Sequence, residues 1–416
     1  MTRAFPASLA ALALWACEPN PPSQRAPSTM RTGLLVATSA TTADGQTPMA
    51  ARLERLRLVD GRWTHETEED PESLVFHLAE AWDPPGPVPL STVTLGGTPA
   101  VVRLWSADGQ TRDAWRAEFT PTMSRMRDGE IGRLYGDAPA PGGLAGDVLV
   151  VGTHDEGVVA VVSPRADGSF EVTELDHRPS TFVHEIEVGD LDGDGIVEVY
   201  ATLSRPNALV VGIDQPGTIV RYVPGLGRGP EVVLDLARRH AKEILVDDVD
   251  GDGRDELYAV IEARTEGTSD APSIAEPVEV RRLTSDGPMD GEILATFDDR
   301  MARFLVAGDL EGDGHRELVL ATFSTGLFRI DPPAESGGRW ESHLLDDDTG
   351  GFEHATLLAD LDEDGADELY VADDASGQLR RYVVGRDAIA REVIRQLPPR
   401  SVITWNLRPC PAELGP

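Results

Sequence analysis

The chain has 416 residues, of which 40% are hydrophobic and 26% are charged, a composition typical of folded globular proteins and too apolar for wholesale disorder. Aspartate and glutamate (72) outnumber lysine and arginine (37), so the formal net charge is −35 at pH 7. Such a chain repels polyanions, which argues against nucleic acid as its partner. Two cysteines exclude a disulfide scaffold and a cysteine-rich zinc site.

The N-terminus has the form of a secretory signal, with one arginine, an apolar run over 7–16 and then Cys17. The run is too short for a permanent transmembrane helix. Its ending, Leu-Trp-Ala-Cys, resembles the lipobox of bacterial lipoproteins, in which the cysteine is acylated after cleavage in front of it. We therefore expect a signal peptide at 1–16, a lipid anchor on Cys17 and a Pro/Ser-rich tether over 17–32. The alternative is an ordinary signal that is cut elsewhere.

This N-terminal signal predicts a protein of the bacterial cell envelope that is anchored by lipid and has no transmembrane helix in the mature chain. Glu18 follows the cysteine where an aspartate would favour retention in the inner membrane, so we expect the outer membrane.

The first third of the globular part contains short β-rich segments that are typical of strands joined by tight turns. Segments 33–40 and 51–59 form one predicted pair, and 91–95 and 100–105 form another. The spacing leaves long insertions at 66–90 and 264–278. A third copy, from Gly136-Asp137 to Asp147, has no acid between its ends and is not expected to bind metal.

Four acidic segments then repeat with starts 58, 61 and 51 residues apart, which is the period of a supersecondary unit. Each has acids at relative positions 1, 3, 5 and 9, glycine at position 6 and an apolar residue at position 10. Calcium prefers six to eight oxygen ligands, and alternate residues of a tight loop can direct carboxylates toward one point. Four carboxylates in one loop would otherwise repel one another strongly.

We therefore expect about four calcium sites, in which position 7 supplies a backbone carbonyl and the other four positions supply side chains. The predicted ligands are Asp190, Asp192, Asp194, Ile196 and Glu198; Asp248, Asp250, Asp252, Arg254 and Glu256; Asp309, Glu311, Asp313, His315 and Glu317; and Asp360, Asp362, Asp364, Ala366 and Glu368.

An EF-hand also begins D-x-D-x-D-G, but it needs a glutamate at position 12 and a helix on each side. Position 12 here is Ala201, Ala259, Leu320 or Val371, and the flanking segments are short and β-rich. Each acidic loop should therefore join two strands.

These loops resemble the FG-GAP or VCBS-type repeats, which form blades of β-propellers and bind calcium between the first two strands of a blade. The resemblance is strong over about 180–383 and fades toward both ends. Family loops usually close with aspartate at position 9, whereas all four loops here use glutamate.

The resemblance and the strand count predict an all-β fold, a β-propeller of seven four-stranded blades over 33–407, with six or eight as alternatives. Segment 401–407 reads as a lone strand that pairs with the first blade and closes the ring. Residues 408–416 should form a C-terminal tail.

A basic residue stands six positions before each loop start, where the innermost strand begins: His184, Lys242, Arg303 and His354. These four could form a basic collar at one mouth of the central channel, suited to a carboxylate, phosphate or sulfated ligand. Alternatively, they pair with neighbouring acids or pack between blades.

No established catalytic motif occurs in the sequence. The sequence therefore favours a calcium-binding, non-catalytic binding module for an unidentified protein or glycan. The alternative is an envelope polysaccharide lyase or hydrolase that acts on acidic glycans with the same fold.

Overall fold

The computed structural model describes residues 30, 32–42, 47–117, 119, 124–205, 211–268, 271–334, 338–352, 354–385, 388–398 and 401–415. The expected signal peptide, Cys17 and most of the tether lie outside the described residues. In the described part, the helices are the short turns η1 (Pro224–Leu226) and η2 (Ala412–Leu414), and no helix is long and apolar enough to cross a membrane.

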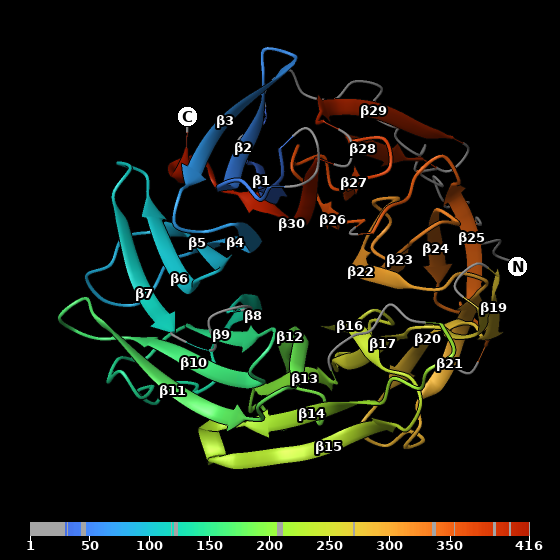
Figure 1. The fold of residues 1–416 in the computed structure, drawn as a ribbon, viewed down its shortest axis with the longest axis horizontal. Helices are drawn as coiled ribbons and strands as arrows, with labels where there is room; N and C mark the ends of the chain where they lie inside the picture. Colours follow the sequence, from blue (N-terminus) through green and yellow to red (C-terminus); the bar gives the residue numbers. More distant parts are fainter. Residues whose placement is uncertain are drawn as a thin grey trace, which may run out of the picture.

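Seven four-stranded antiparallel sheets are arranged as the blades of a propeller ring (Figure 1). Blade 1 has β1 (Gly33–Ala40), β2 (Ala51–Val59), β3 (Arg62–Asp70) and β30 (Val402–Cys410). Blade 2 has β4 (Val75–Trp82), β5 (Ser91–Gly97), β6 (Ala100–Ser106) and β7 (Thr111–Ala117). Blade 3 has β8 (Met126–Gly132), β9 (Val148–Thr153), β10 (Val158–Pro164) and β11 (Phe170–His177). Blade 4 has β12 (Phe182–Gly189), β13 (Glu198–Ser204), β14 (Gly217–Val223) and β15 (Arg228–Leu236). The count of seven is confirmed.

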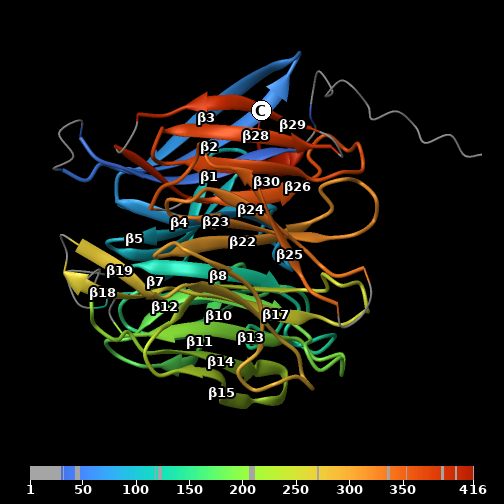
Figure 2. The same cartoon turned by 90° about the vertical axis from the view of Figure 1, so that its right-hand side faces the viewer.

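Blades 5 to 7 follow the same order from the channel outward. Their strands are β16 (Ala241–Asp247), β17 (Glu256–Ile261), β20 (Val278–Leu283) and β21 (Glu292–Phe297); β22 (Ala302–Gly308), β23 (Glu317–Thr322), β24 (Leu327–Asp331) and β25 (Glu341–Asp346); and β26 (Thr356–Ala359), β27 (Glu368–Asp373), β28 (Gln378–Val384) and β29 (Ile389–Gln396). A two-stranded hairpin, β18 (Arg264–Thr268) and β19 (Ala271–Glu276), projects from the side of blade 5 (Figure 2).

The burial pattern explains why the apolar content differs so much between the strands of one blade. Second strands such as β13 and β17 are buried along their whole length, because neighbouring blades cover both faces. Outer strands such as β15 are mostly exposed, and their apolar character is weaker. The most continuous apolar runs therefore mark the second strands rather than the channel lining.

The ring closes as expected, because the C-terminal strand β30 pairs with β1 and becomes the innermost strand of blade 1. Its end differs from the prediction, since β30 extends to Cys410, which is fully buried, and the tail is shorter than residues 408–416. The expected insertion at 66–90 is also wrong: this segment contains the end of β3, all of β4 and the turn before β5. The polar sequence of β3 hid that strand. The segment 264–278 is indeed extra, and it forms the β18–β19 hairpin.

Candidate functional site

The four acidic segments form loops that join the innermost strand of a blade to its second strand. Loop 1 (190–198), loop 2 (248–256), loop 3 (309–317) and loop 4 (360–368) belong to blades 4, 5, 6 and 7. All four therefore emerge from the same end of successive inner strands, where the sequence placed them.

Each loop is held by its own aspartates. In loop 1, the two carboxylate oxygens of Asp190 accept hydrogen bonds from the backbone N–H groups of Asp194 (3.1 Å) and Gly195 (2.7 Å), and Asp194 accepts one from Ile196 (2.8 Å). The same three bonds recur in loops 2, 3 and 4. The glycine at position 6 has φ between 85° and 95° in all four loops, a conformation that favours glycine.

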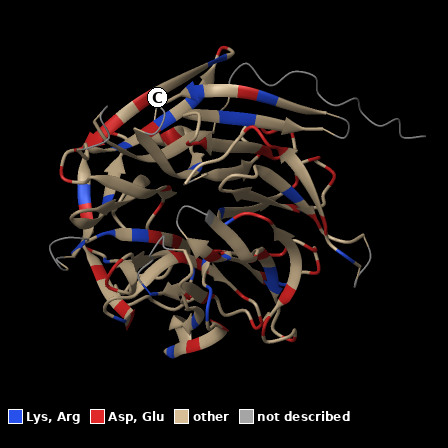
Figure 3. Ribbon diagram, turned by 45° about the vertical axis from the view of Figure 1, so that its right-hand side comes forward, with Lys and Arg blue, Asp and Glu red and all other residues tan. Residues whose placement is uncertain are grey.

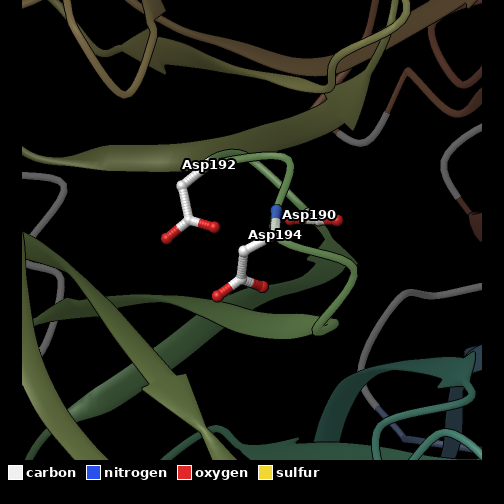
Figure 4. A group of neighbouring side chains, drawn as sticks. All are labelled: Asp190, Asp192 and Asp194. Atoms are coloured by element: carbon white, nitrogen blue, oxygen red, sulfur yellow. Dashed lines mark hydrogen bonds between the residues drawn. The ribbon is translucent and has the colours of Figure 1, made fainter.

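Carboxylates converge in three of the loops. Within the described residues, the groups with ligand oxygens within 4.8 Å of one another are Asp190, Asp192 and Asp194; Asp248, Asp250 and Glu256; and Asp360, Asp362 and Glu368. Figure 4 shows the three aspartates of the first group on one turn of the chain. Loop 3 is not among these groups.

One carboxylate oxygen of loop 4 is placed so that a bound cation would satisfy it. The side chain of Asp362 is only 2% exposed, and its Oδ1 atom has no hydrogen-bond partner. A buried carboxylate oxygen without a donor is costly, and a bound cation would satisfy it. Loops 1, 2 and 4 therefore fit a hard divalent ion, which would supply structural charge neutralisation when bound. The roles predicted for the carbonyls at 196, 254, 315 and 366 stay predictions.

An arginine that sequence reasoning missed faces every loop from the third strand of its own blade. Arg221 lies 3.0 Å from Asp192 and also pairs with Glu198, while Arg282 lies 2.8 Å from Asp250 and 3.8 Å from Glu256. Equivalent pairs join Arg329 to Glu311 (2.8 Å) and Glu317 (3.2 Å), and Arg381 to Asp362 (2.6 Å) and Glu368. Each guanidinium thus bridges positions 3 and 9 of its loop.

The position-9 glutamates are buried and hydrogen-bonded. The hydroxyls of Tyr200, Tyr258 and Tyr370 donate to Glu198, Glu256 and Glu368, and backbone N–H groups in loops 1, 3 and 4 donate to their own glutamates. Burial raises the pKa of Glu256, Glu317 and Glu368 to about 7, although the facing arginine partly offsets this effect.

Position 8 of three loops links neighbouring blades. Asp255 accepts a hydrogen bond from the N–H of Asp190 in loop 1 (2.8 Å), and Asp367 accepts one from Asp309 in loop 3 (2.8 Å). Arg316 donates to Asp247 of blade 5 (2.5 Å). The loop face therefore carries inter-blade bonds as well as candidate metal sites, so a change in one loop reaches its neighbour.

The predicted collar residues lie at the opposite end of the inner strands, and β-bulges hold three of them. At a bulge, an extra residue in one strand is re-aimed away from the regular ladder. Register shifts place His184, Lys242 and Arg303 at bulges in β12, β16 and β22, and His354 lies just before β26. The same shifts occur in β4, β8 and β30, at His77, Arg127 and Trp405.

These seven residues, one from each blade, are defined here as the mouth ring. It contains three histidines, two arginines, one lysine and one tryptophan, and no acid, although the whole chain has a charge of −35. Sequence analysis did not identify His77, Arg127 and Trp405. The collar residues were found by counting back from the acidic loops, and blades 1 to 3 lack such a loop.

Aromatic contacts link the mouth ring to two further histidines. Ring centroids are 4.7 Å apart for Trp405 and His77, 5.6 Å for His154 and His184, and 6.5 Å for His184 and His240. Burial lowers the pKa of His184 well below its usual value, and the neighbouring Lys242 lowers it further, so the imidazole is neutral. Its Nε2 atom has no hydrogen-bond partner although the side chain is only 4% exposed.

The surroundings of the other collar residues are more fully satisfied. The Nε of Arg303 lies 3.5 Å from Glu262, which also bonds to Nε2 of His240 (3.0 Å), and the guanidinium lies over the ring of Phe352. His354 contacts the hydroxyl of Thr349 (2.7 Å) and the carbonyl of Thr322 (2.9 Å). His354 therefore packs between blades, with both ring nitrogens in contact with oxygen atoms.

A belt of six carboxylates lies between the mouth ring and the loops: Glu80, Asp128, Glu130, Glu185, Glu187 and Glu243. Three of them tie inner strands together, since Asp128, Glu187 and Glu243 accept hydrogen bonds from the N–H groups of Ile186 (2.7 Å), Val246 (3.4 Å) and Leu305 (3.1 Å). Arg408 of blade 1 pairs with Glu130 of blade 3 (2.7 Å). Burial raises the pKa of all six.

The belt makes stability depend on pH. The pKa of Glu130 rises from 4.5 to about 8 in the folded state, mainly through burial, so the folded state binds the proton more tightly and the free energy of unfolding falls as pH rises between these values. We expect Glu130→Gln to match the wild type near pH 5 and to unfold about 2–4 °C higher at pH 8, measured by calorimetry. Glu69→Gln, at an exposed position of β3, is the control. Equal pH profiles for the wild type and Glu130→Gln would contradict the prediction.

The acid-poor copy of the loop in blade 3 behaves as a surface turn. Asp137 is fully exposed and pairs with Arg133 at 3.0 Å. No group of three metal-binding side chains occurs there in the described residues. That this blade binds no metal stays a prediction.

Comparisons with known proteins give distant similarities. No protein-family profile matches it. Integrin alpha pat-2 of Caenorhabditis elegans is 25% identical over 174 residues, which cover 38% of this chain and 14% of the integrin, so the chain spans about a seventh of that relative. Among solved structures, a putative 6-phosphogluconolactonase from Bacteroides fragilis matches with a TM-score of 0.45 and 12% identity, covering 92% of this chain and 98% of its own. A rhamnogalacturonan lyase from Bacillus licheniformis matches with a TM-score of 0.30 and 13% identity, covering 84% and 69%.

Proposed function

We propose that this protein is a calcium-binding β-propeller of the bacterial cell envelope, anchored through lipid on Cys17, that binds an anionic ligand at its channel mouth without catalysis. The loop sequences and the integrin alpha relative support an FG-GAP-type propeller. Calcium would act structurally, since the acidic loops lie at the other end of the inner strands from the mouth ring.

The observation that carries the binding role is the mouth ring. Bulges re-aim side chains in six of the seven inner strands, and they bring Arg127, Lys242 and Arg303 to one end of the channel. Nε2 of His184 is a buried polar atom without a partner, which a ligand oxygen would satisfy. Guanidinium and ammonium groups recognise carboxylate, phosphate and sulfate groups.

The test is calorimetric titration with oligogalacturonate, heparin and inorganic phosphate. We expect one of these probes to bind and its affinity to fall at least tenfold in His184→Ala and Arg303→Ala, because each loses a contact of about 1.4 kcal/mol or more. Arg300→Ala is the matched control, since Arg300 is exposed nearby and packs on Phe323 outside the mouth ring.

The same samples discriminate between a binding module and an enzyme. Ultraviolet absorbance of an unsaturated uronate product, or release of reducing ends, that disappears in the same variants would establish the lyase or hydrolase alternative. Binding that both substitutions leave unchanged would place the ligand elsewhere. Failure of all three probes would refute the anionic ligand.

A further inference from the structure

Four arginines, Arg221, Arg282, Arg329 and Arg381, repeat in the structure although they do not stand out in the sequence. They lie on β14, β20, β24 and β28, the third strand of their respective blades, at 31, 34, 20 and 21 residues after the loop start. Irregular spacing hides them, whereas the register of the sheets brings every one to the same place. Four independent copies of one contact argue against chance.

The contacts involve the same carboxylates that converge in the loops. In loop 2, Asp250 and Glu256 belong to the converging group and both pair with Arg282; in loop 4, Asp362 and Glu368 do so with Arg381. A guanidinium carries a permanent positive charge and donates along two edges, so it can bridge two carboxylates. The arginine and a metal ion therefore draw on one set of oxygens.

We infer that each arginine is an internal counter-ion of its loop, which keeps the loop folded in the absence of metal and lowers its affinity for calcium. This inference rests on the proposed calcium-binding function. A glutamate buried at position 9 requires a cation whenever it is ionised, because an unpaired buried charge destabilises the fold strongly. The guanidinium meets this need before metal arrives. Metal then binds against the repulsion of a positive charge already present.

The inference also ranks the loops. Arg329 pairs with three acids, Glu311, Glu317 and Asp331, but Arg282 of loop 2 also pairs with three, Asp250, Glu256 and Glu292. The difference lies in the carboxylates, because those of loop 3 do not converge in the described residues. We therefore expect loop 3 to be the last of the four to bind calcium.

The test is Arg282→Gln, studied by calcium titration calorimetry and by thermal unfolding in calcium and in chelator. We expect loop 2 to bind calcium about tenfold more tightly, because one repelling charge is gone. We also expect a lower melting temperature in chelator, and most of that loss to be recovered in calcium, because metal replaces the missing cation. Arg282→Lys keeps the charge and should restore weak binding.

The matched control is Arg281→Gln. Arg281 is the adjacent residue of β20, but it pairs with Glu279 of its own strand (2.6 Å) and donates to the carbonyl of Asp290, and neither partner belongs to an acidic loop. If Arg282→Gln loses stability equally in calcium and chelator with unchanged calcium affinity, the arginine is only a structural ion pair and the inference is wrong. If the wild type binds no calcium at all, the proposed function itself fails. Should Arg282→Gln not fold, the same pair of measurements on Arg221→Gln decides.

Discussion

Replacing Asp250 and Asp252 together by alanine is expected to reduce the number of bound calcium ions by one and to lower the melting temperature in calcium by about 3–6 °C. Asp250 belongs to a converging carboxylate group, and Asp252 accepts the N–H of Arg254 that shapes the turn. A ligand at about 100 times its dissociation constant stabilises the folded state by about 2.7 kcal/mol, and this contribution disappears with the site. In a domain of this size, such a loss moves the midpoint by a few degrees.

Titration calorimetry and thermal unfolding of the folded chain measure both quantities. The matched control is Asp137→Ala in the acid-poor copy of the loop, where an exposed aspartate pairs only with Arg133 in the described contacts, and where ion count and midpoint should not change. An unchanged ion count in the double variant would mean that loop 2 is a solvated turn. A lost ion in Asp137→Ala would mean that blade 3 carries a metal site despite its composition.

The sequence was informative wherever one residue type at one spacing determines the geometry. The D-x-D-x-D-G pattern fixed the loops because the side chain at position 1 bonds to the backbone at positions 5 and 6, and the glycine at position 6 has the positive φ that the turn requires. These contacts lie within seven residues. The blade count followed from the same period, together with the β-rich runs between successive loops.

Features that depend on sheet register were not accessible in this way. Arg221 lies 31 residues from Asp190 and Arg329 lies 20 residues from Asp309, yet both reach the same position in their blades, because the connections between β13 and β14 and between β23 and β24 differ in length. The bulge at His77 is a second example, since it depends on how β4 pairs with β5. The local periodicity of the sequence encodes neither the contacts of the arginines nor the position of the bulge.

The two ends of the channel have opposite chemistry, and this follows from the direction of the inner strands. All seven inner strands run in the same direction, from the mouth ring to the face that carries the loops. Basic residues at the start of the strands therefore gather at one end of the channel, and the acidic loops that follow the strands of blades 4 to 7 gather at the other. Acidic and basic segments lie side by side around the ring (Figure 3), and arginines neutralise the acids locally. A ligand at the mouth and metal ions at the loops therefore act on the same seven strands from opposite ends.

Removal of β30 is expected to have the largest effect of any change considered. A chain that ends at residue 401 loses the innermost strand of blade 1, with the buried Leu407 and Cys410 and the pair between Arg408 and Glu130. The edge of β1 would then face an open gap, and the belt would lose a cation that offsets the charge of its six acids. We expect this chain to be insoluble or to lack a cooperative thermal transition.

Deletion of the hairpin from Arg264 to Glu276 is the control of similar length, with Gly-Gly as the replacement. The hairpin lies outside the seven blades, and its ion pairs with Asp214 and Arg238 lie at the surface. Glu276 also lies 3.4 Å from the buried Arg239, which keeps Glu279 as its closer partner (2.8 Å) when the hairpin is removed. Because surface pairs contribute about 1 kcal/mol or less each, this variant should keep a single cooperative transition within a few degrees of the wild type. A folded, cooperative chain without β30 would show that blade 1 closes by another route, and that ring closure by the C-terminal strand is not what holds the propeller together.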